Sequence, residues 1–107
     1  MQQGSIVLVP FPFSDFSNIK IRPALVISNK NLGGEDVLIC GISSKSSKKN
    51  EIEISNQELL YGSLPLISFI KTAKIATVSK SIIQKEVALV KDETIKRVIE
   101  EINFFLE

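Results

Sequence analysis

Residues 22–28 read RPALVIS, and this short stretch predicts a buried β-strand with a fixed beginning. Positions 24–27 are apolar without interruption, which is typical of a strand covered on both faces at the centre of a small barrel or sandwich. A residue that precedes proline is restricted to extended backbone, so Arg22 is expected at the entrance of the strand. The stretch therefore predicts a β-rich core with a cation at its edge.

Further runs of β type lie on both sides of this strand and are separated by turn signals. They cover residues 5–9, 36–42, 51–55, 66–70, 73–79 and 86–90, beside the central run at 24–28. Residues 51–54 alternate strictly between Glu and Ile, which predicts one wet face.

The last segment changes to a helical period. Its apolar residues fall on one helix face: Ile95, Val98, Ile99, Ile102, Phe105 and Leu106. Asp92 and Glu93 are placed to favour the helix N-terminus. We therefore expect a mainly β (α+β) fold of about seven short strands, with a C-terminal helix covering a sheet or a barrel opening.

The length and the apolar runs of the chain limit its organisation. A chain of 107 residues predicts one domain over residues 1–107, since domains most often hold roughly 100–150 residues. The longest apolar runs are far shorter than the ~20 residues of a membrane-spanning helix, so no membrane association is expected. The single cysteine, Cys40, lies in an apolar run and is expected to be a buried thiol. A chain without an internal disulfide fits a reducing cytoplasm.

The absence of histidine limits the kinds of catalytic and metal site that the chain can contain. The commonest general base and the commonest metal ligand are both missing from the sequence. With one cysteine and no histidine, a zinc site of the usual kind is excluded, and so are Ser-His-Asp and Cys-His arrangements. We expect no metal and no cofactor.

Charge is unevenly distributed along the chain, although the net charge is only +1. Residues 20–49 contain six basic and two acidic side chains, whereas residues 92–107 contain two basic and five acidic ones. Such a split gives one face that could attract a polyanion. The alternative is a pair of solvated surfaces with no ligand.

Two stretches carry polar residues at strand ends, where they could contact phosphate. The Arg22 guanidinium offers a planar fork of donors, although an arginine at a strand end also commonly forms a surface ion pair. Ser43 and Ser44 follow an apolar strand and precede a lysine-rich loop that begins with Lys45. Their hydroxyls could donate to a phosphate oxygen while lysines track a nucleic-acid backbone, although such loops are often simply solvated.

A third stretch, residues 69–78, places polar side chains on a later strand. Lys71 and Lys74 are the residues expected to face a groove, with Thr77 as a further donor. Lysines on a wet strand face need no function, so this stretch is informative only beside the other two.

Taken in order, these segments resemble the MazF/PemK-like toxin family of metal-independent endoribonucleases. The resemblance covers GSIVLVPFPFSDFSNIKIRPALVISN at 4–29, DVLICGISSKS at 36–46, SFIKTAKIATVSKS at 68–81 and the terminal helix. It implies a small SH3-like barrel with a C-terminal helix, assembled as a homodimer. It also implies cleavage of single-stranded mRNA at short sequence motifs, with a 2′,3′-cyclic phosphate and a 5′-hydroxyl as products, and inhibition by a cognate antitoxin.

The resemblance also assigns roles to individual residues. Arg22 takes the place of the family's catalytic arginine, and Ser43 takes the place of a catalytic strand-end threonine. Phe11, Phe13 and Phe16 are expected to stack on unpaired bases, at ~1–3 kcal/mol for each stack, or else to pack against their own barrel. Lys20, Ser44, Lys45, Lys71, Lys74 and Thr77 complete the expected RNA-binding set.

Some positions depart from the family pattern. Ser43 keeps the hydroxyl of the usual threonine but lacks the methyl group that restricts its rotamers. Lys71 is not followed two positions later by the acidic residue that some members have there. Two alternatives are therefore an inactive barrel that serves as a binding module and a gyrase-poisoning toxin of the CcdB type.

Overall fold

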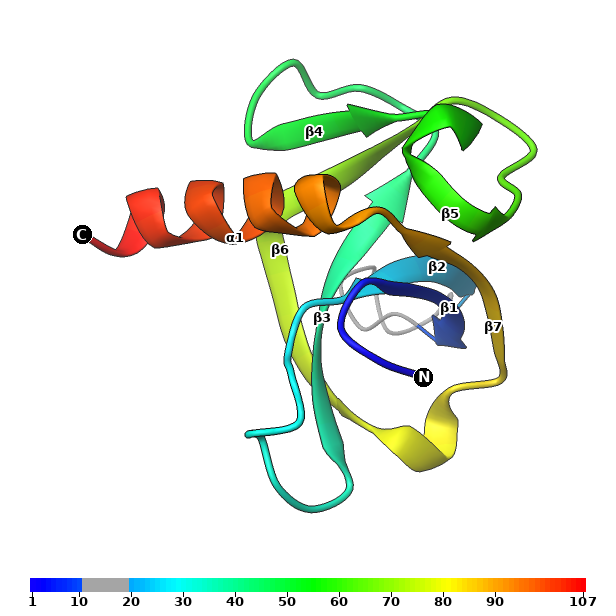
Figure 1. The fold of residues 1–107 in the computed structure, drawn as a ribbon, viewed down its shortest axis with the longest axis vertical. Coiled ribbons are helices and arrows are strands. Elements are labelled where there is room, and N and C mark those ends of the chain that lie inside the picture. The colour runs from blue at the N-terminus through cyan, green and yellow to red at the C-terminus, as the bar shows by residue number, and fades with distance from the viewer. Residues whose placement is uncertain (11–19) are drawn as a thin grey trace.

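The structure is a computed structural model that describes residues 1–10 and 20–107. Its strands are β1 (Ser5–Pro10), β2 (Ile21–Val26), β3 (Asp36–Ser43), β4 (Glu51–Ile54), β5 (Leu59–Gly62), β6 (Ser68–Ser79) and β7 (Lys85–Val90). Short 3₁₀ turns cover Asn56–Glu58 and Lys80–Ile82, and one helix, α1 (Asp92–Leu106), follows β7. The seven strands pair antiparallel in the order β4-β6-β3-β2-β1-β7-β5 (Figure 1).

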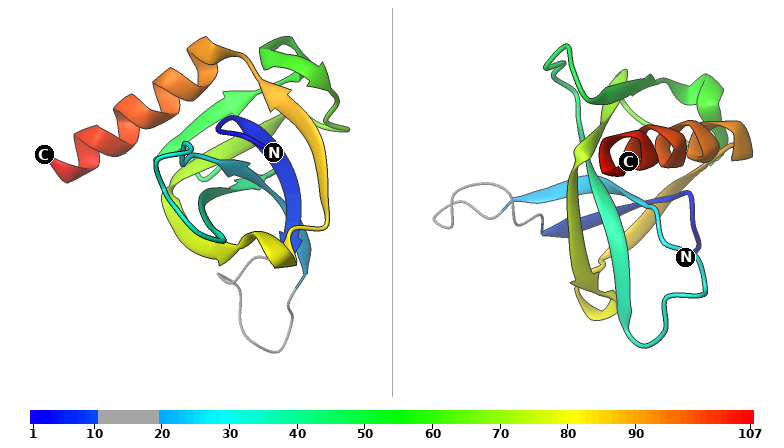
Figure 2. Two further views of the ribbon diagram at one scale, coloured as in Figure 1. Left: turned by 60° about the horizontal axis from the view of Figure 1, so that its bottom comes forward. Right: turned by 90° about the vertical axis from the view of Figure 1, so that its left-hand side faces the viewer.

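The sheet is curled like half of a barrel, so that both faces of its central strands are covered (Figure 2). Along β2, Ala24 and Val26 join one buried cluster, which also holds Val7 and Ile39. Leu25, on the opposite face, joins a larger cluster. Neighbouring residues of a strand point to opposite faces, which explains why every position of 24–27 is apolar.

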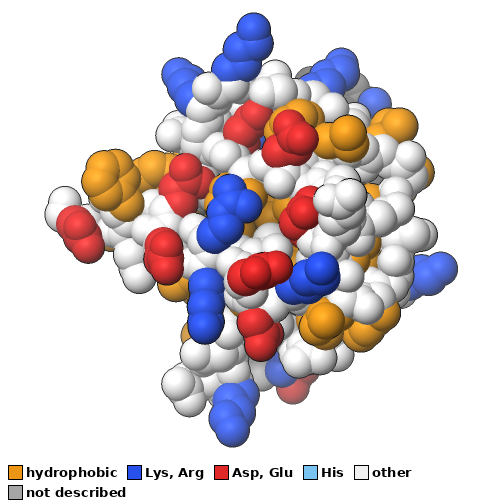
Figure 3. Space-filling model, turned by 45° about the horizontal axis from the view of Figure 1, so that its top comes forward, with side chains coloured by type: hydrophobic (Ala, Val, Ile, Leu, Met, Phe, Trp, Pro, Cys, Tyr) orange, Lys and Arg blue, Asp and Glu red, His pale blue; other side chains and the backbone are white. Residues whose placement is uncertain are grey.

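Helix α1 covers the face that carries the larger cluster. Its first half buries Ile95 and Val98 against that cluster. The predicted apolar face continues to the end of the helix, but the last turn is not covered: Phe105 is 41% exposed and Leu106 is 78% exposed. Hydrophobic side chains are visible at this end of the molecule in Figure 3.

The prediction of a mainly β fold with seven strands and a C-terminal helix is confirmed, but three details of the strand assignment were wrong. The runs predicted at 66–70 and 73–79 belong to one continuous strand, β6, which begins only at Ser68. The short edge strand β5 was not predicted. In addition, β2 starts at Ile21, before the predicted run, and ends at Val26. Among the described residues, no helix is both long and apolar enough to cross a lipid bilayer.

Burial of Cys40 is also as predicted. The thiol lies within the larger cluster and is fully buried. Removal from water disfavours the thiolate and raises the pKa of Cys40 to about 12. The residue is therefore a small core side chain that remains a neutral thiol.

Candidate functional site

Strand register brings Arg22 and Ser43 together. In the β2–β3 pair, Ala24 lies opposite Gly41 and Leu25 lies opposite Cys40. Arg22 and Ser43 each lie two residues beyond the Ala24–Gly41 pair, at the adjacent ends of β2 and β3. Two residues that are distant in the sequence thereby lie at one end of two neighbouring central strands.

Both residues line one open groove with a volume of about 670 Å³. The groove runs across the ends of β2 and β3, and it is also bordered by the loop after β3, the segment before β6 and β6 itself. Its lining residues are Ile21, Arg22, Pro23, Gly41, Ile42, Ser43, Ser44, Lys45, Ser46, Ser47, Leu64, Pro65, Leu66, Ser68, Lys71 and Lys74. The lining includes four cations and no carboxylate among the described residues, so the groove suits an anionic ligand.

The Ser43 hydroxyl has a defined hydrogen bond. Its Oγ accepts a hydrogen bond from the backbone N–H of Lys45 at 3.1 Å. A hydroxyl has one donor proton as well as its acceptor lone pairs. The Ser43 proton therefore remains available to a ligand in the groove.

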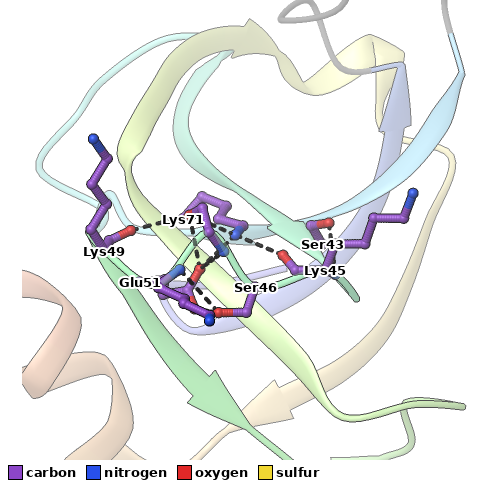
Figure 4. A network of polar contacts seen from close by, with 8 residues as sticks. Ser43, Lys45, Ser46, Lys49, Glu51 and Lys71 are labelled. Atoms are coloured by element: carbon purple, nitrogen blue, oxygen red, sulfur yellow. Dashed lines mark hydrogen bonds and ion pairs between the residues drawn. The ribbon is translucent and has the colours of Figure 1, made fainter.

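Lys71 and Glu51 form a close pair beneath the loop that follows β3. They lie directly opposite each other in the β4–β6 register, and Lys71 Nζ donates to Glu51 Oε1 at 2.6 Å (Figure 4). Nζ also donates to the Lys45 carbonyl at 2.8 Å and to Ser47 Oγ at 3.1 Å. The hydrogen bond from Lys71, followed by that from Ser46, lowers the pKa of Glu51 to about 2.

A family model for the PemK-like, MazF-like toxin of type II toxin–antitoxin systems matches residues 2–106. The chain belongs to this PemK/MazF-like toxin family. No curated protein sequence matches the chain.

Solved structures share the PemK/MazF-like fold at low sequence identity. The MazE–MazF complex (Form III) of Deinococcus radiodurans has a TM-score of 0.77 and 15% identity, and the alignment covers 99% of this chain and 95% of that chain. Mycobacterium tuberculosis toxin MazF-mt6 has a TM-score of 0.73 and 14% identity, with 94% and 93% covered. A mycobacterial endoribonuclease in complex with its cognate antitoxin has a TM-score of 0.72 and 15% identity, with 99% and 92% covered. Likeness at this identity establishes the PemK/MazF-like fold.

The groove of this PemK/MazF-like chain collects most of the residues that the sequence singled out. Arg22, Ser43, Ser44, Lys45, Lys71 and Lys74 all contribute to its lining. Lys20 and Thr77 are exposed, and neither belongs to the described lining. Phe11, Phe13 and Phe16 lie outside the described residues, so their assignment stays a prediction.

Sequence reasoning missed Glu51 and the wall formed by Leu64, Pro65 and Leu66. Glu51 was assigned only to the wet face of its strand, and nothing local marks it as the partner of Lys71. The apolar wall carries no charge, and the only local signal for it is Pro65 between two leucines after Gly62 and Ser63, which indicates a turn rather than a site.

Proposed function

We propose that this chain is the toxin of a type II toxin–antitoxin pair and cleaves single-stranded mRNA at short sequence motifs without a metal ion. The observation that carries the proposal is the meeting of Arg22 and Ser43 in one cationic groove. Membership of the PemK/MazF-like family supports it, as do fold neighbours that are named endoribonucleases.

The proposed reaction uses the nucleophile of the substrate. The RNA 2′-hydroxyl loses its proton and bonds to the adjacent phosphorus, while the bond to the 5′-oxygen breaks and that oxygen gains a proton. The products are a 2′,3′-cyclic phosphate and a 5′-hydroxyl. The protein must orient the strand and stabilise the charge that develops on the phosphoryl oxygens.

Arg22 and Ser43 divide this task. The exposed guanidinium of Arg22 offers several donors to the phosphoryl oxygens, and its very high pKa makes electrostatic stabilisation its role rather than proton transfer. Ser43 donates its free hydroxyl proton to the same phosphate. Lys45 and Lys74, which are exposed in the groove, neutralise flanking phosphates.

The remaining residues of the predicted RNA-binding set have supporting roles in the proposal. Ser44 adds a hydroxyl at the groove, and contact of the exposed Lys20 and Thr77 with RNA beyond the described lining stays a prediction. Phe11, Phe13 and Phe16 stack on bases in this scheme. Lys71 was also expected to contact RNA, but its ammonium group already donates to three protein oxygens, so no RNA contact is proposed for it.

The test is cleavage of a long single-stranded RNA in the presence of EDTA. Wild-type protein is expected to cleave, and Arg22→Ala is expected to lower kcat by about 10²–10³-fold, as expected for loss of a donor to the transition state. Arg97→Ala is the matched control, since Arg97 is exposed on α1 and lies outside the described groove lining. Failure of the wild-type protein to cleave, or full activity of Arg22→Ala, would refute the assignment.

We also propose that the toxin acts in the cytoplasm as a homodimer held in check by a cognate antitoxin. The exposed apolar side chains Phe104, Phe105 and Leu106 offer a surface for association. Antitoxin complexes among the fold neighbours support the second partner. Light scattering at micromolar concentration is expected to give the mass of a dimer, and a monomer would contradict the proposal.

A further inference from the structure

The loop between β3 and β4, residues 44–50, has a backbone that must be held in place. Lys48 has φ +63° and Asn50 has φ +54°, and these are the only non-glycine residues with positive φ among those described. The left-handed conformation is unfavourable for lysine and less so for asparagine, and it persists where surrounding contacts fix it. Both residues lie in the loop whose first part, residues 44–47, lines the groove. This first part is held by contacts from two neighbouring strands.

Those contacts come from Glu51 and Lys71. The side chains of the pair are only 10% and 9% exposed, respectively. The Glu51 carboxylate accepts from the Ser47 backbone N–H at 2.8 Å and from the Ser46 hydroxyl. Lys71 Nζ donates to the Lys45 carbonyl at 2.8 Å. The pair thus fixes the loop from Lys45 to Ser47.

The same contacts extend to the Ser43 hydroxyl. Lys71 holds the carbonyl of Lys45, and the N–H of Lys45 donates to Ser43 Oγ at 3.1 Å. We propose that Glu51 and Lys71 are positioning residues that orient the Ser43 hydroxyl in the groove through the backbone of Lys45. Figure 4 shows the pair, the loop and Ser43 together. The inference rests on the proposed function for its catalytic consequence.

A serine at position 43 needs outside contacts to fix the orientation of its hydroxyl. Threonine carries two heavy atoms on Cβ, which restricts its χ1 angle, whereas serine has only its hydroxyl oxygen there. An unrestrained serine distributes over three staggered wells. The Lys45 N–H selects the well in which Oγ meets it, and it leaves the hydroxyl proton free for the phosphate. The Glu51–Lys71 pair therefore supplies the order that a β-branched side chain would supply by itself.

This role of Lys71 is distinguishable from direct binding of RNA. The ammonium group has three protons, and three protein oxygens accept from it. If Lys71 neutralised a phosphate, its removal would weaken RNA binding and reduce the salt dependence of binding. If it positions Ser43, its removal lowers kcat while the dissociation constant for RNA stays nearly unchanged.

The experiment compares Glu51→Ala with Glu53→Ala, a control that removes an exposed carboxylate from the same face of β4. Glu51→Ala is expected to lower kcat at least about threefold, since Ser43 then samples three wells, with little change in the dissociation constant of a non-cleavable RNA. Glu53→Ala is expected to match wild type. Lys71→Met is the second variant and is expected to lower kcat in the same way.

The variant Ser43→Thr distinguishes positioning of Ser43 from a general structural role of the pair. A general structural role would give the same loss of kcat with either residue at position 43. In the Ser43→Thr background, Glu51→Ala is expected to cause little further loss of kcat, because the threonine rotamer is restricted by its own methyl group. An equal loss in both backgrounds, or full kcat in Glu51→Ala, overturns the inference.

Hydrogen exchange separates this inference from the proposed function. The Lys45 amide is expected to exchange faster with solvent in Glu51→Ala than in wild type, and unchanged exchange overturns the inference whether or not RNA is cleaved. A wild-type protein that cleaves no RNA overturns the proposed function instead. In that case the exchange rate of the Lys45 amide still shows whether Glu51 orders the loop and Ser43.

Discussion

The salt dependence of RNA binding tests the composition of the groove. Three basic side chains of its lining, Arg22, Lys45 and Lys74, are exposed, whereas Lys71 is buried and paired with Glu51. Each phosphate neutralised on a single strand contributes about −0.7 to the slope of log K against log salt, so three contacts give a slope of about −2. A tenfold rise in salt is then expected to weaken binding about 100-fold.

Single substitutions resolve the individual contributions. Lys45→Met and Lys74→Met are each expected to reduce the magnitude of the slope to about 1.4, because one counterion-releasing contact is lost. Lys71→Met is expected to leave the slope unchanged. Lys30→Met is the control. Lys30 is exposed in the segment between Val26 and Asp36, at the ends of β2 and β3 that lie away from Arg22 and Ser43.

The assay is fluorescence anisotropy of a short 2′-O-methyl oligonucleotide, which lacks the attacking hydroxyl and stays intact. Binding is measured at several salt concentrations for each variant, so that slopes rather than single affinities are compared. A wild-type slope near zero would refute the assignment of the groove as the RNA site. A slope that falls with Lys30→Met and not with Lys45→Met would refute it as well.

Three further predictions concern stability and reactivity. Gly62 has φ +83°, and a Cβ there would lie 2.2 Å from the Val87 carbonyl oxygen; Gly62→Ala should therefore lower the free energy of unfolding by about 2–4 kcal/mol. Gly33→Ala, with no atom within 4 Å of its Cβ, should change it by less than about 0.5 kcal/mol, and equal melting temperatures of the two variants would contradict this. The buried Cys40 thiol, with its pKa raised to about 12, should react with a disulfide reagent at about pH 8 only after denaturation, so rapid reaction of the folded protein would be the contrary result. Because the pKa of Glu51 is lowered from 4.5 to about 2, its contribution to stability is complete above pH 4.5 and is lost as pH falls toward 2; urea midpoints should fall more across that window in wild type than in Glu51→Gln.

Local patterns in the sequence were sufficient for much of the fold. The unbroken apolar run at 24–27 predicted a central strand. Neighbouring residues of a strand face opposite sides of the sheet, so every position is apolar only when both faces are covered. The helical spacing from Ile95 onward predicted α1 for a similar reason, since one face of the helix had to be apolar to pack on the sheet. In both cases the pattern of apolar residues within one short segment is enough to show which of its faces are buried.

The errors arose where a distant partner changes the meaning of a residue. Strand β6 was divided in two because Lys71 and Thr72 look like a polar break, and yet Lys71 is buried within the strand because Glu51 lies opposite it. Lysine is almost never buried unless it is paired, and the pair depends on strand register. Strand β5 escaped notice because its short run lacks alternation and its pairing with β7 is irregular.

By itself, the sequence determined which residues are chemically able to act, because residue type sets charge, donors and acid–base behaviour. It offered Arg22 and Ser43 as candidates and, by lacking histidine, excluded the usual zinc and Ser-His-Asp sites. Phosphate chemistry without a protein nucleophile was implied only by the family resemblance. Only the tertiary structure decided that the two candidates line one groove and that Glu51 and Lys71 hold the loop beside them. The physical reason is that strand register, fixed by burial across the whole sheet, sets which distant side chains become neighbours.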